Sequence, residues 1–228
     1  RRILAGGEAV CAAAGIPIAG GHSIDVVEPI YGLVGLGSVD PARLKRNSGA
    51  MAGDVLILGK PLGIGVLSAA LKKGVLSAAG YQDMVDWTTR LNVTGCRLAE
   101  MAQVHAITDV TGFGLAGHLL EICRGSRLAA RVEFNRLPLI AEAVAHVRAG
   151  IATGASSRNW ASYGQEVFLA PELEEWQQKL VTDPQTSGGL LVSCAPEAVD
   201  QVLAAFRADG FAEAAVVVHR LVVAAGVV

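Results

Sequence analysis

The 228-residue sequence contains no long apolar run, although 52% of its residues are hydrophobic and its mean hydropathy is +0.43. No segment approaches the roughly 20 uninterrupted apolar residues that a membrane-spanning helix needs. A strong excess of one charge is also missing, because the net charge is −2 and the isoelectric point is about 6.2. A protein without a basic field has little to attract a polyanion. We therefore expect neither a membrane nor a nucleic-acid partner, but a soluble globular protein with buried strands and a buried subunit interface.

Cysteine is scarce and shows no paired spacing. There is no Cys-x-x-Cys pair and no histidine at zinc-ligand spacing, so neither a structural zinc site nor a redox pair is indicated. The four cysteines are Cys11, Cys96, Cys123 and Cys194. Each lies in an apolar helix or strand pattern, so we expect four buried free thiols. Unpaired cysteines fit the reducing cytoplasm, where we expect the protein to reside.

The segment Thr108-Asp-Val-Thr-Gly-Phe-Gly-Leu115 places one carboxylate between a predicted strand and a predicted helix. Residues 104–107 are apolar and partly β-branched, which indicates a buried strand. Apolar residues then recur at helical spacing over residues 112–123. Asp109 would thus lie at the end of a strand, beside a helix N-terminus that favours anions. This pattern is typical of a metal ligand at a phosphate site, and a helix-capping carboxylate is the alternative.

Paired glycines follow a second predicted strand. Gly20 and Gly21 come directly after the apolar run 16–19, and His22 and Ser23 follow them. Glycines at such a place let backbone N–H groups approach a phosphate closely, while the next side chains supply polar groups. For His22, a turn histidine bonded to the backbone is the alternative interpretation.

A third polar segment, residues 182–190, has the composition of a turn-rich loop leading into a buried strand. Within it, Asp183, Thr186 and Ser187 are candidates for lining the same cleft as Asp109. Lys60 ends a predicted strand, and we interpret it as a surface lysine in preference to a phosphate ligand.

Several segments, in the right order across nearly the whole chain, together closely resemble selenophosphate synthetase. The matching segments are residues 20–25 with 28–32, 60–65, 108–115 with 117–118, 157–164 and 183–189. The resemblance implies the two-domain α/β fold of aminoimidazole ribonucleotide synthetase. It also implies a magnesium-dependent reaction of selenide, ATP and water that yields selenophosphate, AMP and phosphate. Members of that family pair two chains, with ATP between them.

The resemblance also assigns roles to individual residues. Asp109 corresponds to a magnesium-ligating aspartate of the family. Gly20, Gly21 and His22, with the adjoining Ser23, correspond to a stretch that contacts nucleotide at the dimer interface. On this resemblance we assign no catalytic residue within the sequence.

The family's opening segment, with its reactive cysteine or selenocysteine, a lysine and further aspartates, has no counterpart here. Residues 1–14 instead have the pattern of a helix end, without an initiator methionine or a signal peptide. We expect residues 1–45 to be the remnant of an N-terminal ATP-binding and dimerisation domain with a partial sheet, and residues 46–228 to be a complete C-terminal α/β domain. Such a fragment should be inactive alone. The alternatives are another ATP-dependent enzyme of the superfamily, or a non-catalytic dimerising domain.

The remaining pattern alternates between strands and helices, which predicts the α/β class. The predicted strands are 16–20, 29–39, 54–59, 129–134, 190–194, 214–218 and 221–228. The predicted helices are 63–73, 81–102 with a break near Asn92, 139–149, 171–180 and 196–209. Residues 157–164 are interpreted as a loop anchored by its aromatic side chains, and His118 as a hydrogen-bonded or solvent-facing helix residue.

Overall fold

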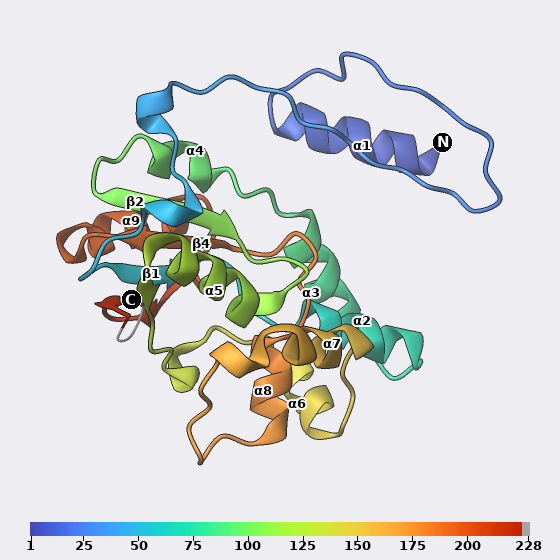
Figure 1. The fold of residues 1–228 in the computed structure, drawn as a ribbon. Coiled ribbons are helices and arrows are strands. Elements are labelled where there is room, and N and C mark those ends of the chain that lie inside the picture. The colour runs from blue at the N-terminus through green and yellow to red at the C-terminus, as the bar shows by residue number, and fades with distance from the viewer. Residues whose placement is uncertain (225–228) are drawn as a thin grey trace. The chain divides into compact units, whose positions relative to one another are not determined.

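A computed structural model of the protein, shown in Figure 1, describes residues 1–224. The chain divides into two compact units, residues 1–44 and residues 45–228. In the first unit, helix α1 (Arg2–Ala13) buries Gly7 and Cys11. The ring of Tyr31 lies so close to Gly7 that a Cβ there would overlap it. Close approach to an aromatic ring therefore accounts for glycine at this position.

The strands predicted at residues 16–20 and 29–39 are wrong. Between α1 and the short 3-10 helix Pro41–Arg43 the chain is irregular, with no strand among the described residues. A strand needs a neighbour to receive its backbone hydrogen bonds, and no second strand of this unit is present to provide one. Both segments are rich in apolar residues, as expected of strands, but they form no sheet within residues 1–224.

The second unit is built around a four-stranded sheet with the order β2-β4-β1-β5. Each neighbouring pair is antiparallel. The strands are β1 (Val55–Leu58), β2 (Val104–Asp109), β4 (Leu190–Cys194) and β5 (Ala215–Val218), and a separate small pair joins β3 (Leu128–Ala129) to β6 (Val222–Val223). The sheet thus interleaves segments from both ends of the unit. The α/β class is confirmed, with an antiparallel sheet.

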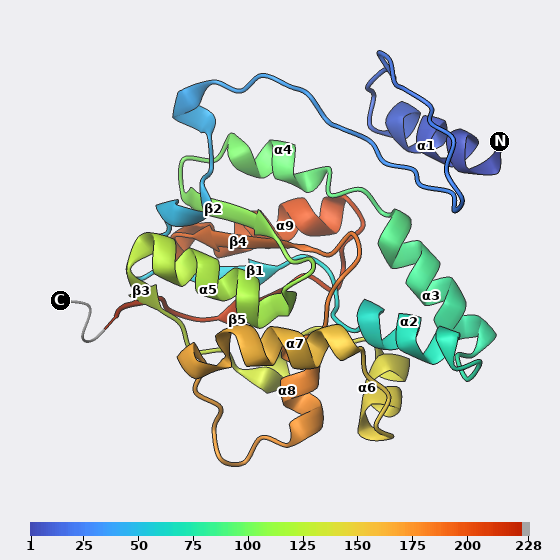
Figure 2. The same cartoon turned by 45° about the vertical axis from the view of Figure 1, so that its right-hand side comes forward.

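Helices cover both faces of the sheet, as Figure 2 shows. On one face, Leu56 and Leu58 of β1 pack with α5 (Gly114–Ser126). On the other face, Val55 and Ile57 pack in a core with α4 (Thr94–Ala99) and α9 (Val199–Ala208). Alternate residues of a strand point to opposite faces, so a strand that is apolar throughout is suited to a sheet covered on both sides.

A helical layer adjoins the sheet and has a core of its own. It contains α2 (Ile64–Lys72), α3 (Ala78–Thr89), α6 (Ala141–Arg148), α7 (Gly154–Tyr163) and α8 (Glu175–Val181). Residues from α2, α6 and α8 form the centre of this second core. An isolated bridge between Leu62 and Leu139 connects the segment before α2 with the segment before α6. The loops that follow β2 and precede β4 lie between this layer and the sheet.

Three further predictions need correction. The segment 157–164 was interpreted as a loop, but residues 157–163 belong to helix α7 and Gly164 begins a 3-10 helix. The first turn of α7 is capped by Thr153, which accepts from the Ser156 N–H at 3.1 Å. Only the beginning of the strand predicted at 129–134 is present, in β3. The helix predicted from residue 171 begins later, at Glu175, after a capping box. Of the last predicted strand, residues 225–228 lie outside the described residues.

Three of the four cysteines are buried as predicted, but Cys96 is exposed. Burial raises the pKa of Cys123 to about 11 and that of Cys194 to about 12, so both remain thiols at neutral pH. Among the described residues, no helix combines the length and apolar character needed to span a membrane.

Candidate functional site

Asp109 is the last residue of β2, as predicted, and its side chain is exposed. Its backbone is in register with Leu190 of β4. Within residues 1–224 the carboxylate makes no hydrogen bond or ion pair. It is therefore available to an external cation, and it does not cap α5.

The turn that follows Asp109 is held by two side chains of α7. Asn159 donates hydrogen bonds to the carbonyl oxygens of Gly112 at 2.9 Å and Thr182 at 3.0 Å. Tyr163 donates a short hydrogen bond to the carbonyl oxygen of Phe113. Burial raises the pKa of Tyr163 to about 12, so its hydroxyl keeps the proton that it donates. The segment was expected to be a loop anchored by its aromatic side chains, but it is a helix, and Tyr163 anchors the turn after Asp109.

His118 supports the same turn from α5. It is 7% exposed, and its Nε2 lies 3.2 Å from the hydroxyl oxygen of Thr111. Its Nδ1 lies 3.3 Å from a carboxylate oxygen of Glu121, but the geometry does not form a hydrogen bond. His118 thus holds the turn after Asp109, in agreement with the prediction of a hydrogen-bonded helix residue.

The loop after α8 interlocks with the start of α2. Gln185 accepts from the N–H groups of Gly63 and Ile64, each at 3.2 Å, and Asp183 accepts from the Val66 N–H at 3.2 Å. These side chains therefore satisfy N–H groups that a helix start leaves without partners. Asp183 is fully buried, so the prediction that it lines a cleft is wrong. Its carboxyl group instead caps a helix more than a hundred positions away in the sequence.

Burial raises the pKa of Asp183 from 3.8 to about 7, despite opposing hydrogen bonds from Val66 and Gln185. The unfolded carboxyl loses its proton near pH 4, whereas the folded one keeps it until about pH 7. The stability that the neutral group contributes is therefore fully present at low pH and is lost as the pH rises through about 7.

We expect the substitution Asp183→Asn, which cannot ionise, to remove this loss. The stability of the variant relative to wild type should then increase between about pH 5 and pH 8. Urea unfolding at both pH values measures the change, and Asp83→Asn, at an exposed position of α3, is the matched control. A stability difference for Asp183→Asn that is the same at both pH values would contradict the prediction.

Lys60 is not the surface lysine that the sequence suggested, since it is 1% exposed. Its ammonium group donates to the carbonyl oxygens of Arg90 at 2.6 Å, Ser187 at 2.6 Å and Trp87 at 3.2 Å. Burial, followed by the nearby charge of Arg90, lowers the pKa of Lys60 to about 8. The charged form therefore predominates at neutral pH.

The loop that receives Lys60 also touches the residue after Asp109. The Val110 N–H donates to the carbonyl oxygen of Gly189 at 2.9 Å. A Cβ on Gly188 would overlap the carbonyl oxygen of Val110, and one on Gly189 would overlap the backbone nitrogen of Lys60. Both glycines are thus required by close backbone packing.

Thr186 and Ser187 are exposed on this loop, and Ser187 has a left-handed backbone with φ 49°. That these two residues line a cleft near Asp109 stays a prediction.

The four predicted nucleotide contacts lie in the first unit. Gly20, Gly21, His22 and Ser23 are exposed and belong to the irregular segment after α1. No heavy atom of the described residues lies within 4 Å of a Cβ built on either glycine. The predicted nucleotide contacts and the predicted metal ligand therefore fall in different units of the chain.

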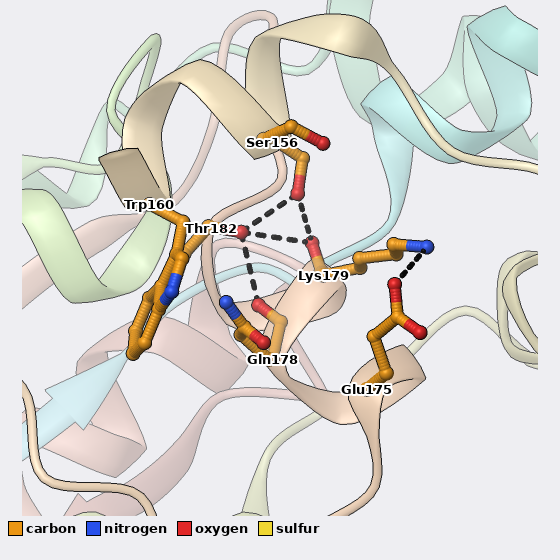
Figure 3. Close-up of a pocket in the computed structure, with 7 residues that line it drawn as sticks. Ser156, Trp160, Glu175, Gln178, Lys179 and Thr182 are labelled. Carbon is orange, nitrogen blue, oxygen red and sulfur yellow. Dashed lines mark hydrogen bonds and ion pairs between the residues drawn. The ribbon is translucent and has the colours of Figure 1, made fainter. Parts of the chain in front are cut away.

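A pocket of about 180 Å³ lies between α7 and α8. Figure 3 shows the residues that line it, and Asp109 is not one of them. Ser156 and Thr182 are hydrogen-bonded to each other at 2.7 Å, and Ser156 donates to the Lys179 carbonyl oxygen at 3.0 Å. The Lys179 ammonium lies 2.7 Å from a carboxylate oxygen of Glu175. Because these polar groups are bonded to one another, the pocket presents few unpaired groups to a ligand.

Asp109 fits magnesium as a single ligand. Magnesium prefers hard oxygen ligands and is often held by one or two carboxylates together with substrate phosphates and water. Across residues 1–224, no group of three or more histidine, cysteine or acidic side chains could enclose a metal ion. An exposed and unpaired carboxylate at a strand end, beside a fixed turn, therefore suits a site that substrate phosphates and water would complete.

Sequence reasoning missed Lys60, Gln185 and Asn92 as supports of this region. The Asn92 side chain donates to the Gly188 carbonyl oxygen at 2.9 Å. The partners of all three side chains lie far away in the sequence, so no local periodicity indicates them. The one available signal was the short distance between Lys60 and an entirely apolar strand, from which Gly59 alone separates it.

Comparison with known proteins first identifies a family. Residues 51–219 match the family described as "AIR synthase related protein, C-terminal domain". Two curated relatives carry the name selenide, water dikinase. One, from Burkholderia ambifaria (strain MC40-6), is 66% identical over 94% of this chain and 61% of its own length. The other, from Pseudomonas straminea, is 62% identical over 95% of this chain and 60% of its own length. The chain thus spans about three-fifths of these relatives.

Solved structures agree on the fold. Thiamine-monophosphate kinase from Stenotrophomonas maltophilia K279a has a TM-score of 0.56 at 19% identity, covering 82% of this chain and 52% of that protein. Escherichia coli HypE, a hydrogenase maturation protein, has a TM-score of 0.55 at 19% identity, covering 78% of this chain and 46% of that protein. These likenesses concern the fold alone. Together with the family match, they confirm the predicted fold of the aminoimidazole ribonucleotide synthetase type.

Proposed function

Since this chain belongs to the family of AIR synthase related proteins, we propose that it forms part of a selenide, water dikinase. The whole enzyme would convert selenide, ATP and water to selenophosphate, AMP and phosphate. The support is 66% identity to a relative of that name over 94% of this chain. Because the chain spans only 61% of that relative, we propose that the complete activity belongs to a longer protein and that the 228-residue chain alone is inactive.

The exposed and unpaired carboxylate of Asp109 carries this proposal. Phosphoryl transfer depends chiefly on positioning and on charge neutralisation, and a magnesium ion would supply the neutralisation when bound. Asp109 would hold that ion through a carboxylate oxygen. Asn159 and Tyr163 fix the backbone of the turn beside it, so this turn does not need to be ordered when substrate arrives.

We also propose that Gly20, Gly21, His22 and Ser23 contact the nucleotide. No packing in the described residues explains the two glycines, which supports a close approach of their backbone to a ligand absent from this structure. His22 and Ser23 would supply side-chain hydrogen bonds to the same ligand.

We further propose that residues 1–45 are the remnant of an N-terminal ATP-binding and dimerisation domain, that residues 46–228 are the C-terminal domain, and that the protein is a cytoplasmic homodimer. Large exposed apolar side chains in the first unit support an interface there. They include Ile24 at 68%, Val27 at 104%, Ile30 at 80%, Val34 at 88% and Leu36 at 94% exposure. The free state of all four cysteines supports a reducing compartment.

The proposed activity is tested by phosphorus NMR of the products formed from ATP, magnesium and selenide. We expect selenophosphate, AMP and phosphate from the full-length protein and none of them from the 228-residue chain. Selenophosphate from the chain alone would contradict its proposed inactivity. ATP cleavage by the full-length protein without selenophosphate would indicate a different acceptor, and no cleavage by either would favour a non-catalytic dimerising domain.

A further inference from the structure

Lys60 is an unusual buried group because it has no acidic partner among residues 1–224. Lysine is rarely buried completely unless its charge is paired. In the part of the chain that the structure describes, the ammonium group bonds to three carbonyl oxygens and, at 3.4 Å, to the hydroxyl of Ser187. A methionine would fill similar space without the cost of burying a charge. The donors of the ammonium group, rather than its bulk, therefore explain lysine at this position.

The three carbonyl groups belong to two separate segments. Those of Trp87 and Arg90 lie at the C-terminal end of α3, where helix carbonyls lack intrahelical partners and the dipole favours a cation. The third belongs to Ser187, in the loop before β4. Lys60 thus ties the end of α3 to that loop. Asn92 makes a second tie through the carbonyl oxygen of Gly188.

The opposite side of this loop lies against the end of β2. The backbone of Gly188 and Gly189 is packed between Lys60 and Val110, with too little space for a side chain on either glycine. Val110 also donates its N–H to Gly189. A displacement of the loop would therefore be transmitted directly to Val110, which adjoins Asp109.

We propose that Lys60 is a positioning residue that, through the loop 187–189, fixes the place of the Asp109 carboxylate for metal binding. Asn92 assists by holding the same loop. This inference rests on the proposed function, because it takes Asp109 to be a magnesium ligand. Groups that hydrogen-bond directly to a metal ligand commonly change the metal affinity by about 10- to 100-fold. Lys60 acts one segment further away, so we expect its effect at the lower end of that range.

The test measures Mn²⁺ binding to the full-length protein by electron paramagnetic resonance, in the presence of a non-hydrolysable ATP analogue. Lys60→Met should weaken Mn²⁺ binding by about 10-fold or more. Saturating Mn²⁺ should restore ATP turnover, because the substitution alters KM for the metal complex rather than kcat.

The control is Lys72→Met, at an exposed position at the end of α2, which should leave the Mn²⁺ affinity and the ATP turnover unchanged. A purely structural role for Lys60 would lower the unfolding temperature but leave the Mn²⁺ affinity of the folded protein as it was, and this result would overturn the proposal.

A second variant decides the matter if Lys60→Met does not fold. Asn92→Ala removes a neutral hydrogen bond from a half-buried position and should weaken Mn²⁺ binding in the same direction by a smaller factor. Unchanged Mn²⁺ affinity in a folded Asn92→Ala protein would overturn the proposal in that case. Because the binding measurement needs no turnover, a wild-type protein that binds Mn²⁺ but makes no selenophosphate would contradict the proposed function and leave the role of Lys60 standing.

Discussion

Substitution of Asp109 by alanine is expected to lower selenide-dependent ATP turnover of the full-length protein by about 10³-fold or more. Removing one group that stabilises developing charge in a reaction typically costs about 10²- to 10³-fold, and loss of the metal ligand removes the ion as well. The thermal unfolding midpoint should not change, because the carboxylate is exposed and makes no hydrogen bond or ion pair within residues 1–224. Initial rates of AMP formation at several magnesium concentrations provide the measurement.

The control for this variant is Asp83→Ala, which removes another exposed carboxylate, on α3. It should retain wild-type turnover and an unchanged unfolding midpoint. Wild-type rates in the Asp109→Ala protein would refute the assignment of Asp109 as a metal ligand. A lowered unfolding midpoint would instead point to a structural role for this carboxylate.

The largest expected loss of stability follows substitution of Gly188 by alanine. The new Cβ would overlap the carbonyl oxygen of Val110, and neither backbone segment can yield without breaking contacts on its other side. Overpacking of this kind costs about 3 kcal/mol, which corresponds to a fall of about 6 °C or more in the unfolding midpoint of a chain of this size. Differential scanning calorimetry measures the shift.

Gly112→Ala is the matched control for this substitution. Its Cβ would have no heavy atom within 4 Å, although it too lies in a turn next to the Asp109 strand. We expect a change in stability of no more than about 0.5 kcal/mol. Equal unfolding midpoints for the two variants would show that the contact between the loop and Val110 is not rigid.

The elements that could be predicted from the sequence are those defined by local pattern. The prediction of residues 190–194 matches β4, and the prediction of 54–59 differs from β1 by one residue at each end. Both strands are continuous apolar runs bounded by turn residues, so burial on two faces is evident from the residues themselves. The break predicted near Asn92 also falls between α3 and α4.

The predictions that failed are those that depend on distant residues. Helix α7 contains glycine and serine residues that are weak helix formers, and its packing through Asn159 and Tyr163 overrides that local preference. The burial of Lys60 depends on carbonyl groups up to 127 positions away. The strands predicted in the first unit had the right apolar pattern but no neighbouring strand with which to pair.

The position of Asp109 at a strand end was predictable because the strand, the carboxylate and the helix start are adjacent in sequence. The contacts that hold the backbone after Asp109 could not be predicted, because they come from much later segments of the chain. Asn159 donates to the Gly112 carbonyl oxygen, and Gly189 accepts from the Val110 N–H. The proposed chemistry of Asp109 follows from the family, together with the exposed and unpaired state of the carboxylate.

The order of strands in the sheet also has a consequence for how this domain emerges during protein synthesis. Strands β1 and β2 are not neighbours, since β4 lies between them. Strand β5 pairs with the other edge of β1. A nascent chain on the ribosome can therefore form no part of this sheet until Leu190 and the residues after it have been translated. Until then the entirely apolar β1 has no partner strand within its own sheet, so this stretch of the unfinished chain is prone to aggregation.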